Sequence, residues 1–178
     1  MPSAFLEKAF LEECLCVLTR TPATFNALLR GLPDSWTSAT EGPGTWSPHM
    51  VMGHLIHADK VDWMPRLEII LQHGTTRPFD PFDRMAELDP NQPLPDLLDQ
   101  FSTLRQQNLT RLQALNLQPE QLALEGLHPA LGPVTVRQLL ATWTAHDLAH
   151  LLQVSRVMAK HLKLEVGPWA EYLSVMNG

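Results

Sequence analysis

The chain has 178 residues, of which 44% are hydrophobic and 18% are charged, and its net charge is −6. A chain of this length can bury roughly 70% of the surface that its unfolded form exposes, so we expect one domain over residues 1–178. No apolar run approaches the roughly 20 residues that cross a bilayer, and the N-terminus lacks the basic and apolar segments of an export signal. No cluster of Lys and Arg could hold a phosphate backbone. The sequence therefore predicts a cytoplasmic protein without membrane or nucleic-acid partners.

Two cysteines, Cys14 and Cys16, lie two positions apart in a segment with helical periodicity. On a helix they point to different sides, so they can neither form a disulfide with each other nor chelate one ion together. We expect both to be reduced packing residues.

Four segments have helical periodicity, and none combines alternating β-branched residues with hairpin turn signals. The expected helices cover about Ser3–Leu29, Ser47–Gly74, Leu94–Leu115 and Thr135–Leu162. Ser47-Pro48 is typical of a helix start, and the residues from Thr135 to Gln138 form a capping-box pattern. The predicted fold class is all-α, a four-helix bundle without strands.

Prolines modify this expectation at three places. Pro22 should kink or split the first helix, and Pro65 should interrupt the second one late. Between the second and third helices lies the segment RPFDPFDRMAELDPNQP, which has four prolines and three aspartates. Such a composition excludes regular structure and predicts a long crossover over one end of the bundle.

Histidines on two of the predicted helices point toward the bundle interior. His146 and His150 are four residues apart, so they stack on one helix face and can reach a single metal ion. They share a stripe with buried-type residues Leu139, Trp143, Val154 and Val157. His54 also faces inward on the second helix, where it shares its stripe with Met50, Val51, Ala58, Val61 and Ile69.

A single inward histidine is usually a hydrogen-bonded core residue, but three of them on two helices can meet around one metal ion. We therefore predict that His54, His146 and His150 bind one divalent ion per chain. Zinc or nickel is favoured because imidazole nitrogen suits both ions. His57 lies at the edge of the stripe and is a candidate for a supporting or catalytic role. His49, His73 and His161 lie near helix ends and need no function.

Three nitrogen ligands without a fourth protein donor describe an open, catalytic type of site. Water would occupy the free position and could supply hydroxide, or the ion could bind and deprotonate a thiol. The candidates for a general base are Asp147, His57 and Glu68.

Two polar residues of the third helix, Arg105 and Asn108, share the inward stripe of Leu94, Leu97, Phe101, Leu112 and Leu115. Either Arg105 forms a buried ion pair with an acidic residue, for which Asp83 and Asp147 are the candidates, or it binds an anionic substrate in the pocket. The second interpretation makes Arg105 and Asn108 substrate-binding residues and Arg105 a catalytic candidate.

Near the metal ligands, Asp147 and Gln153 could orient an imidazole through its second nitrogen. An exposed aspartate on a helix needs no such role, so both interpretations of Asp147 stay open.

Three stretches together resemble the DinB/YfiT-like superfamily of proposed metalloenzymes: EGPGTWSPHMVMGHLIHADKVDW, RPFDPFDR and HPALGPVTVRQLLATWTAHDLAHLLQ. The resemblance covers nearly the whole chain. It implies a four-helix bundle of non-sequential topology, often a homodimer, in which three histidines bind nickel, zinc or another divalent ion.

The resemblance does not imply one reaction, since relatives include thiol S-transferases, an isomerase of a thiol conjugate and members without known activity. We expect a metal-dependent transferase or hydrolase acting on a small molecule, which could be a low-molecular-weight thiol. The alternative is a non-enzymatic protein that binds a metal or small ligand in a stress response. No appended thiol-recognition domain is visible in the sequence.

Overall fold

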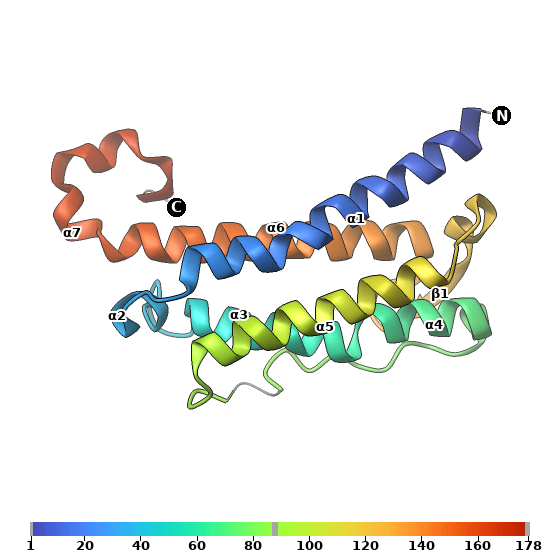
Figure 1. Ribbon diagram of the computed structural model, residues 1–178, viewed down its shortest axis with the longest axis horizontal. Coiled ribbons are helices and arrows are strands. Elements are labelled where there is room, and N and C mark those ends of the chain that lie inside the picture. The colour runs from blue at the N-terminus through green and yellow to red at the C-terminus, as the bar shows by residue number, and fades with distance from the viewer. Residues whose placement is uncertain (1, 87–88, 177–178) are drawn as a thin grey trace.

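The computed structural model describes residues 2–86 and 89–176, which form an α-helical bundle with one small hairpin (Figure 1). The long helices are α1 (Pro2–Leu29), α3 (Pro48–Val61), α4 (Trp63–His73), α5 (Leu94–Ala114) and α6 (Val136–His161). Short elements complete the chain: helices α2 (Asp34–Thr37) and α7 (Lys163–Val166), strands β1 (Glu125–His128) and β2 (Gly132–Thr135), and 3₁₀ turns at Gly74–Thr76, Pro119–Ala123, Gly167–Tyr172 and Ser174–Met176.

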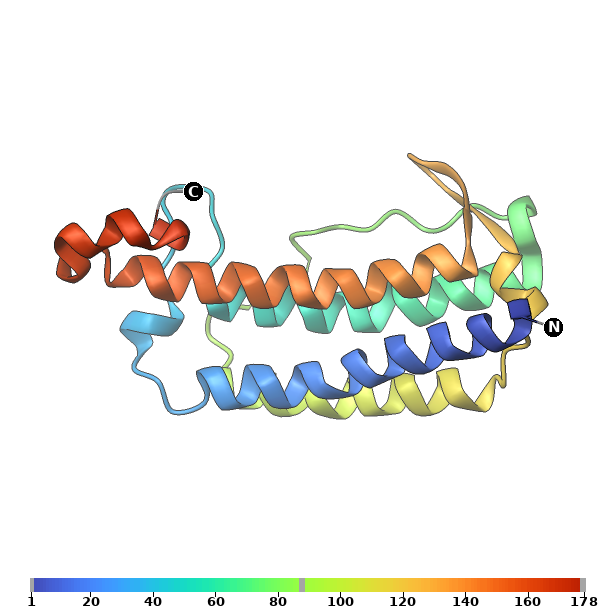
Figure 2. The ribbon, with the colours of Figure 1, turned by 90° about the horizontal axis from the view of Figure 1, so that it is seen from above.

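The four helical rods do not pack in chain order. Helix α1 packs against α5 and α6, and α3 packs against the same two helices, so α1 and α3 lie diagonally across the bundle. Helices α3 and α5 run in the same direction, and the chain must therefore return along the bundle between α4 and α5 (Figure 1). The crossover was predicted to pass over one end of the bundle, but its described residues, 77–86 and 89–93, return along the length of the bundle (Figure 1 and Figure 2).

Both predicted helix starts are confirmed by their caps. The Ser47 hydroxyl accepts a hydrogen bond from Met50 N at 3.2 Å, with Pro48 as the first helical residue of α3. At α6 the Thr135 hydroxyl accepts from Gln138 N, and Gln138 Oε1 accepts from Thr135 N. These bonds satisfy amide groups that the first helical turn leaves unpaired, so they fix where each ligand-bearing helix begins.

The prolines act differently in the two helices where they were expected to interrupt the chain. Helix α1 continues through Pro22 as one bent helix rather than splitting (Figure 1). The second predicted helix is divided into α3 and α4 at Asp62, three residues before Pro65. The pyrrolidine ring of a helical proline clashes with the carbonyl four residues earlier, which here belongs to Val61, the last residue of α3.

The hairpin is a correction to the prediction of a chain without strands. Strands β1 and β2 pair antiparallel, and Phe79 N of the crossover donates to Leu127 O at 2.9 Å. A Cβ on Gly126 would lie 2.6 Å from Ile70 Cγ1 and 2.8 Å from Phe79 Cε1, so this position has no room for a side chain. The strands are four residues long and contain Gly and Pro, which explains why β-propensity did not reveal them.

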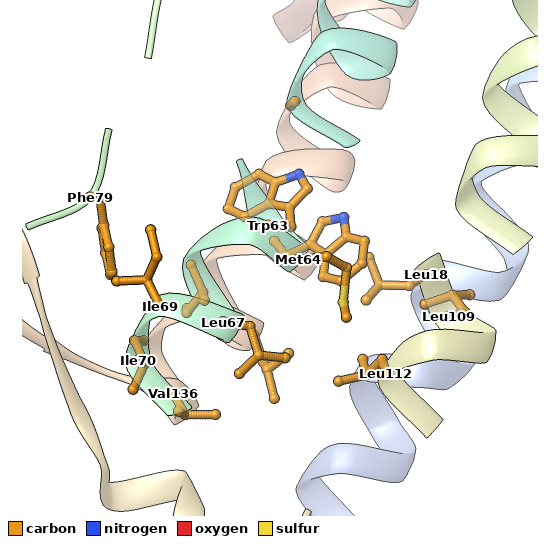
Figure 3. Packing of buried hydrophobic residues seen from close by; sticks show 14 of the residues in the cluster. Leu18, Trp63, Met64, Leu67, Ile69, Ile70, Phe79, Leu109, Leu112 and Val136 are labelled. Atoms are coloured by element: carbon orange, nitrogen blue, oxygen red, sulfur yellow. The ribbon is translucent and has the colours of Figure 1, made fainter. Parts of the chain in front are cut away.

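Two hydrophobic clusters fill the interior, one toward each end of the bundle. The first surrounds α4, where Trp63, Met64 and Leu67 face Leu18, Leu109 and Leu112 (Figure 3). The second contains residues from all four rods: Phe25, Leu29, Val51, Met52, Leu55, Ile56, Leu97, Leu98, Phe101 and Val154. Between them every rod contributes a buried polar residue, namely Thr21 on α1, Asp59 on α3, Arg105 on α5 and Asp147 on α6.

Several smaller expectations are settled by burial. Cys14 is buried, as a packing residue should be, but Cys16 is exposed, and both thiols are free. Val61, expected on the inward stripe of His54, is 45% exposed because α3 ends there. No helix in the described part of the chain is long and apolar enough to span a bilayer.

Candidate metal centre

The three predicted ligands meet between α3 and α6. His146 Nε2 lies 3.1 Å from His54 Nε2 and 3.1 Å from His150 Nε2. The ligand atoms of all three residues lie within 4.8 Å of one another, and no further His, Cys, Asp or Glu of the described chain joins the group. His54 is buried, whereas His146 and His150 are partly exposed. The sequence-predicted triad therefore exists as a cluster that is open on one side.

This geometry fits a metal ion better than it fits hydrogen bonds among the rings. Nitrogens bound to a tetrahedral zinc ion at about 2.0–2.1 Å lie about 3.3 Å apart, close to the observed spacing. One imidazole nitrogen carries either one hydrogen or one lone pair, so His146 Nε2 cannot form good hydrogen bonds with both neighbours. An ion that accepts all three lone pairs removes this conflict.

The surroundings keep the imidazoles neutral, which is the form that binds metals. Burial, followed by the charges of His150 and His146, lowers the pKa of His54 to about 3. Burial, followed by the charge of His150, lowers the pKa of His146 to about 3 as well. Burial also lowers the pKa of His150, although its contact with Gln153 acts in the opposite direction. No proton therefore competes for these nitrogens at neutral pH.

One ligand has a partner that orients its ring. His150 Nδ1 lies 2.9 Å from Gln153 Oε1, so the Nδ1 hydrogen is donated there and the lone pair of Nε2 faces the cluster. This is the role that the sequence suggested for Gln153. The Nδ1 atoms of His54 and His146 are buried without a hydrogen-bond partner among the described residues.

Aromatic rings enclose the cluster. Trp46 lies 4.7 Å from His54 and stacks on His150 at 6.2 Å with an interplanar angle of 9°. Trp63 contacts His146 at 5.1 Å, and Phe82 of the crossover contacts His54 at 5.6 Å. These rings exclude water from the flanks of the three imidazoles.

Ion pairs hold the loop that carries Trp46. Glu41 accepts hydrogen bonds from Arg156 Nε at 2.8 Å and from Arg156 Nη2 at 2.7 Å, and Lys160 Nζ lies 3.0 Å from the same carboxylate. Both cations are on α6, about two and three turns beyond His150. The loop is thereby attached to the helix that provides two of the three ligands.

Arg105 forms a buried ion pair, which is one of the two alternatives that the sequence left open. Its Nε donates to Asp59 Oδ2 at 2.7 Å, and its Nη2 donates to Asp59 Oδ1 and Asp147 Oδ1 at 3.0 Å each. Its Nη1 donates to Asp147, to Thr21 Oγ1 and to Leu18 O. Every guanidinium N–H has a protein acceptor, and the side chain is 1% exposed. Burial would lower the pKa of Arg105, but Asp147 and Asp59 raise it.

The partners of Arg105 correct three expectations. Asp147 is the partner, as one alternative held, and it is fully buried rather than exposed. Asp83 is not a partner, because it is exposed and accepts from Met85 N. Asp59 was missed, although its position four residues after Leu55 placed it on an inward face. Asp147 Oδ2 accepts a hydrogen bond from Thr21 Oγ1 of α1, and among the described residues it accepts none from His146 or His150.

Asn108 also contacts the cluster of Arg105 and its carboxylate partners, and among the described residues it does not face a pocket. Its side-chain amide donates to Asp59 O at 2.7 Å, near the end of α3, and it is 2% exposed. Arg105 and Asn108 together thus connect α5 to α3. The prediction that they bind substrate finds no contact that supports it, and an anion would have to displace a carboxylate to reach Arg105.

The remaining candidates lie in different places. His57 is buried and its ring lies 5.1 Å from Phe82, so it is near His54 without entering the triad. Glu68 pairs with Arg111 on α5. His49 Nε2 lies 2.7 Å from the carbonyl oxygen of Gln92, and His161 packs on Trp36, so both are explained by packing. His73 is exposed at the end of α4.

A residue that the sequence analysis did not single out lies beside the triad. The Arg84 guanidinium carbon is 5.7 Å from the centre of the Trp46 ring. Its charge is among the causes that lower the pKa of His54, His146 and His150. Periodicity could not reveal Arg84, because it belongs to the irregular crossover.

Comparison with known proteins identifies the family. A sequence model of the DinB superfamily matches residues 18–154, a range that includes all three histidines. The chain belongs to the DinB superfamily. No curated protein matches its sequence.

A solved structure supports the same fold assignment. The protein is similar to YfiT from Bacillus subtilis with a TM-score of 0.72 and 19% identity, over 84% of this chain and 86% of YfiT. YfiT is described as a probable metal-dependent hydrolase with an unusual four-helix bundle topology. The predicted DinB-like four-helix bundle is thus confirmed.

Proposed function

We propose that this DinB superfamily protein is a metal-dependent enzyme that binds one divalent ion through His54, His146 and His150 and acts on a small molecule. The observation that carries the proposal is the convergence of three neutral imidazole nitrogens whose mutual contacts hydrogen bonds cannot satisfy. Zinc and nickel are the ions that such nitrogen ligands favour. The description of YfiT as a probable metal-dependent hydrolase agrees with this assignment.

Hydrolysis is the reaction class that we favour. An ion held by three protein nitrogens with a free position supplies a hydroxide or thiolate nucleophile at neutral pH. The carboxylate candidates for a general base are engaged elsewhere, since Asp147 pairs with Arg105 and Glu68 pairs with Arg111. Of the predicted bases, only His57 lies close to the site. Activation by the ion therefore fits this site better than activation by a side-chain base.

Turnover measurements test the proposal. Zinc-loaded and nickel-loaded protein would be assayed against esters, amides and phosphoesters, and against low-molecular-weight thiols paired with an electrophile. We expect metal-dependent turnover that His150→Ala abolishes and that His73→Ala, a change of an exposed histidine, leaves intact. Transfer of a thiol without hydrolysis would make the protein a thiol S-transferase instead. Metal binding without any turnover would favour the alternative of a metal or ligand binding protein.

The homodimer and the cytoplasmic location remain predictions of the proposal. Light scattering of the purified protein tests the first, and fractionation of the source cells tests the second.

A further inference from the structure

We propose that Arg84, held over Trp46, binds a carboxylate of the small molecule that reaches the metal centre. This inference rests on the proposed function, because it assigns a substrate class to the same site. It names a residue of the crossover, outside the four helical rods, as the group that recognises the substrate.

Trp46 connects Arg84 to the triad, because both contact its ring. The Trp46 ring lies against His54 at 4.7 Å and parallel to His150 at 6.2 Å. The Arg84 guanidinium carbon lies 5.7 Å from the centre of the same ring. The guanidinium and two of the histidines thus contact the same indole ring. A small molecule with two functional groups can reach both the triad and the guanidinium.

The guanidinium is available to a ligand. Arg84 is exposed, and within residues 2–86 and 89–176 it forms no hydrogen bond or ion pair. Its sequence neighbour Asp83 accepts a hydrogen bond from Met85 N instead. This distinguishes Arg84 from Arg105, whose donors are all used, and from Arg77 of the same crossover, which pairs with Asp80.

The charge balance around the triad favours an anion. Three neutral imidazoles leave the charge of a bound divalent ion uncompensated, and Arg84 adds another positive charge. The buried carboxylates of the layer are already engaged, because Asp59 and Asp147 share Arg105 and Asp62 pairs with Arg66. The ion and Arg84 have the same sign, and together they attract a ligand of the opposite sign. A ligand carboxylate would supply the missing negative charge.

The chemistry of Arg84 selects a carboxylate rather than another anion. A guanidinium presents parallel N–H donors that match the two oxygens of a carboxylate. A single exposed arginine matches the one negative charge of a carboxylate. The indole face of Trp46 can at the same time cover the apolar part of the ligand.

A pair of probes that differ only in charge tests this subsite. Calorimetry would measure the binding of 3-mercaptopropionate and of its amide, 3-mercaptopropionamide, to zinc-loaded protein. Both probes carry a thiol that zinc accepts, and only the first carries a carboxylate. We expect the wild type to prefer the carboxylate probe by roughly two- to fivefold, as for an exposed charge pair. Arg84→Met should abolish the preference, and Arg84→Lys should keep part of it.

Controls separate the subsite from the metal centre. Arg77→Met removes another exposed arginine of the crossover and should keep the preference. Zinc content, measured in each variant by elemental analysis, should stay at the wild-type level. Equal binding of both probes to zinc-loaded wild type, or a preference that survives in Arg84→Met, would overturn the subsite alone. A wild-type protein that takes up no zinc would overturn the proposed function and the subsite with it.

Discussion

Two polar clusters lie next to each other in the middle of the bundle, and they differ in how far the protein satisfies them. In the cluster of Arg105, Asp59 and Asp147, each donor of the arginine meets an acceptor of the protein. In the cluster of His54, His146 and His150, nitrogens that cannot all bond to one another face a common point. One cluster is complete as it stands, whereas the other needs a partner that the proposed ion would supply.

The Arg105 cluster has a structural role, because it holds together the helices that carry the histidines. Arg105 bridges α3 and α6, the helices that carry the histidines, and its bond to Thr21 adds α1. It therefore fixes the position of His54 relative to the other two ligands. Burial raises the pKa of Asp59, and the opposing effect of Arg105 limits the rise to about 6, so the carboxylate is mostly charged at neutral pH. The complete cluster maintains the fold that holds the incomplete one.

The largest effect on stability is expected from Arg105→Met. This change leaves two buried carboxylates without their counter-ion and should lower the free energy of unfolding by about 3–5 kcal/mol. Urea denaturation followed by circular dichroism measures it. Arg30→Met removes an exposed pair with Asp99 and should cost no more than about 1 kcal/mol. Equal losses in both variants would show that the buried cluster is not the stabilising one.

A smaller loss is expected from Gly126→Ala, which is remote from both clusters. The new methyl group would overlap Ile70 and Phe79, and overpacking of this kind costs about 1–3 kcal/mol. Thermal unfolding tests the stability, and elemental analysis should find the same metal content as in the wild type. Loss of metal in this variant would mean that stability and the metal centre cannot be separated.

The sequence predicted the incomplete cluster better than the complete one. Histidines at positions 54, 146 and 150 stand out because an inward imidazole is unusual in an apolar stripe. Asp147 was predicted as one of two possible partners of Arg105, but Asp59 was missed, because a buried charge is revealed only by the partner that neutralises it. Helix starts were predicted well from local caps at Ser47 and Thr135. The short hairpin and Arg84 depend on tertiary contacts of the crossover, which periodicity does not encode.

Removal of the metal should change the fold very little. The two hydrophobic clusters and the Arg105 cluster do not include the ion, so the helical circular dichroism should persist after treatment with a chelator. The melting temperature should fall only by the amount that ligand binding contributes. Unfolding on chelation would indicate a structural metal site instead.

The smallest effect is expected from Gln153→Ala. Loss of the acceptor for His150 Nδ1 leaves the ring free to turn and should weaken metal affinity roughly 10- to 100-fold without affecting stability. Competition with a coloured chelator measures the affinity. Gln106→Ala changes an exposed glutamine of α5 and serves as the matched control. Unchanged affinity in Gln153→Ala would show that packing alone orients His150.

The most direct test of the central claim is the metal content of the purified protein and of three single variants, His54→Ala, His146→Ala and His150→Ala. Elemental analysis after loading with zinc and removal of excess ion should find about one zinc per chain in the wild type and in His73→Ala. Each triad variant should lose the ion while keeping the wild-type circular dichroism spectrum. One zinc per chain retained in all three triad variants would contradict the account.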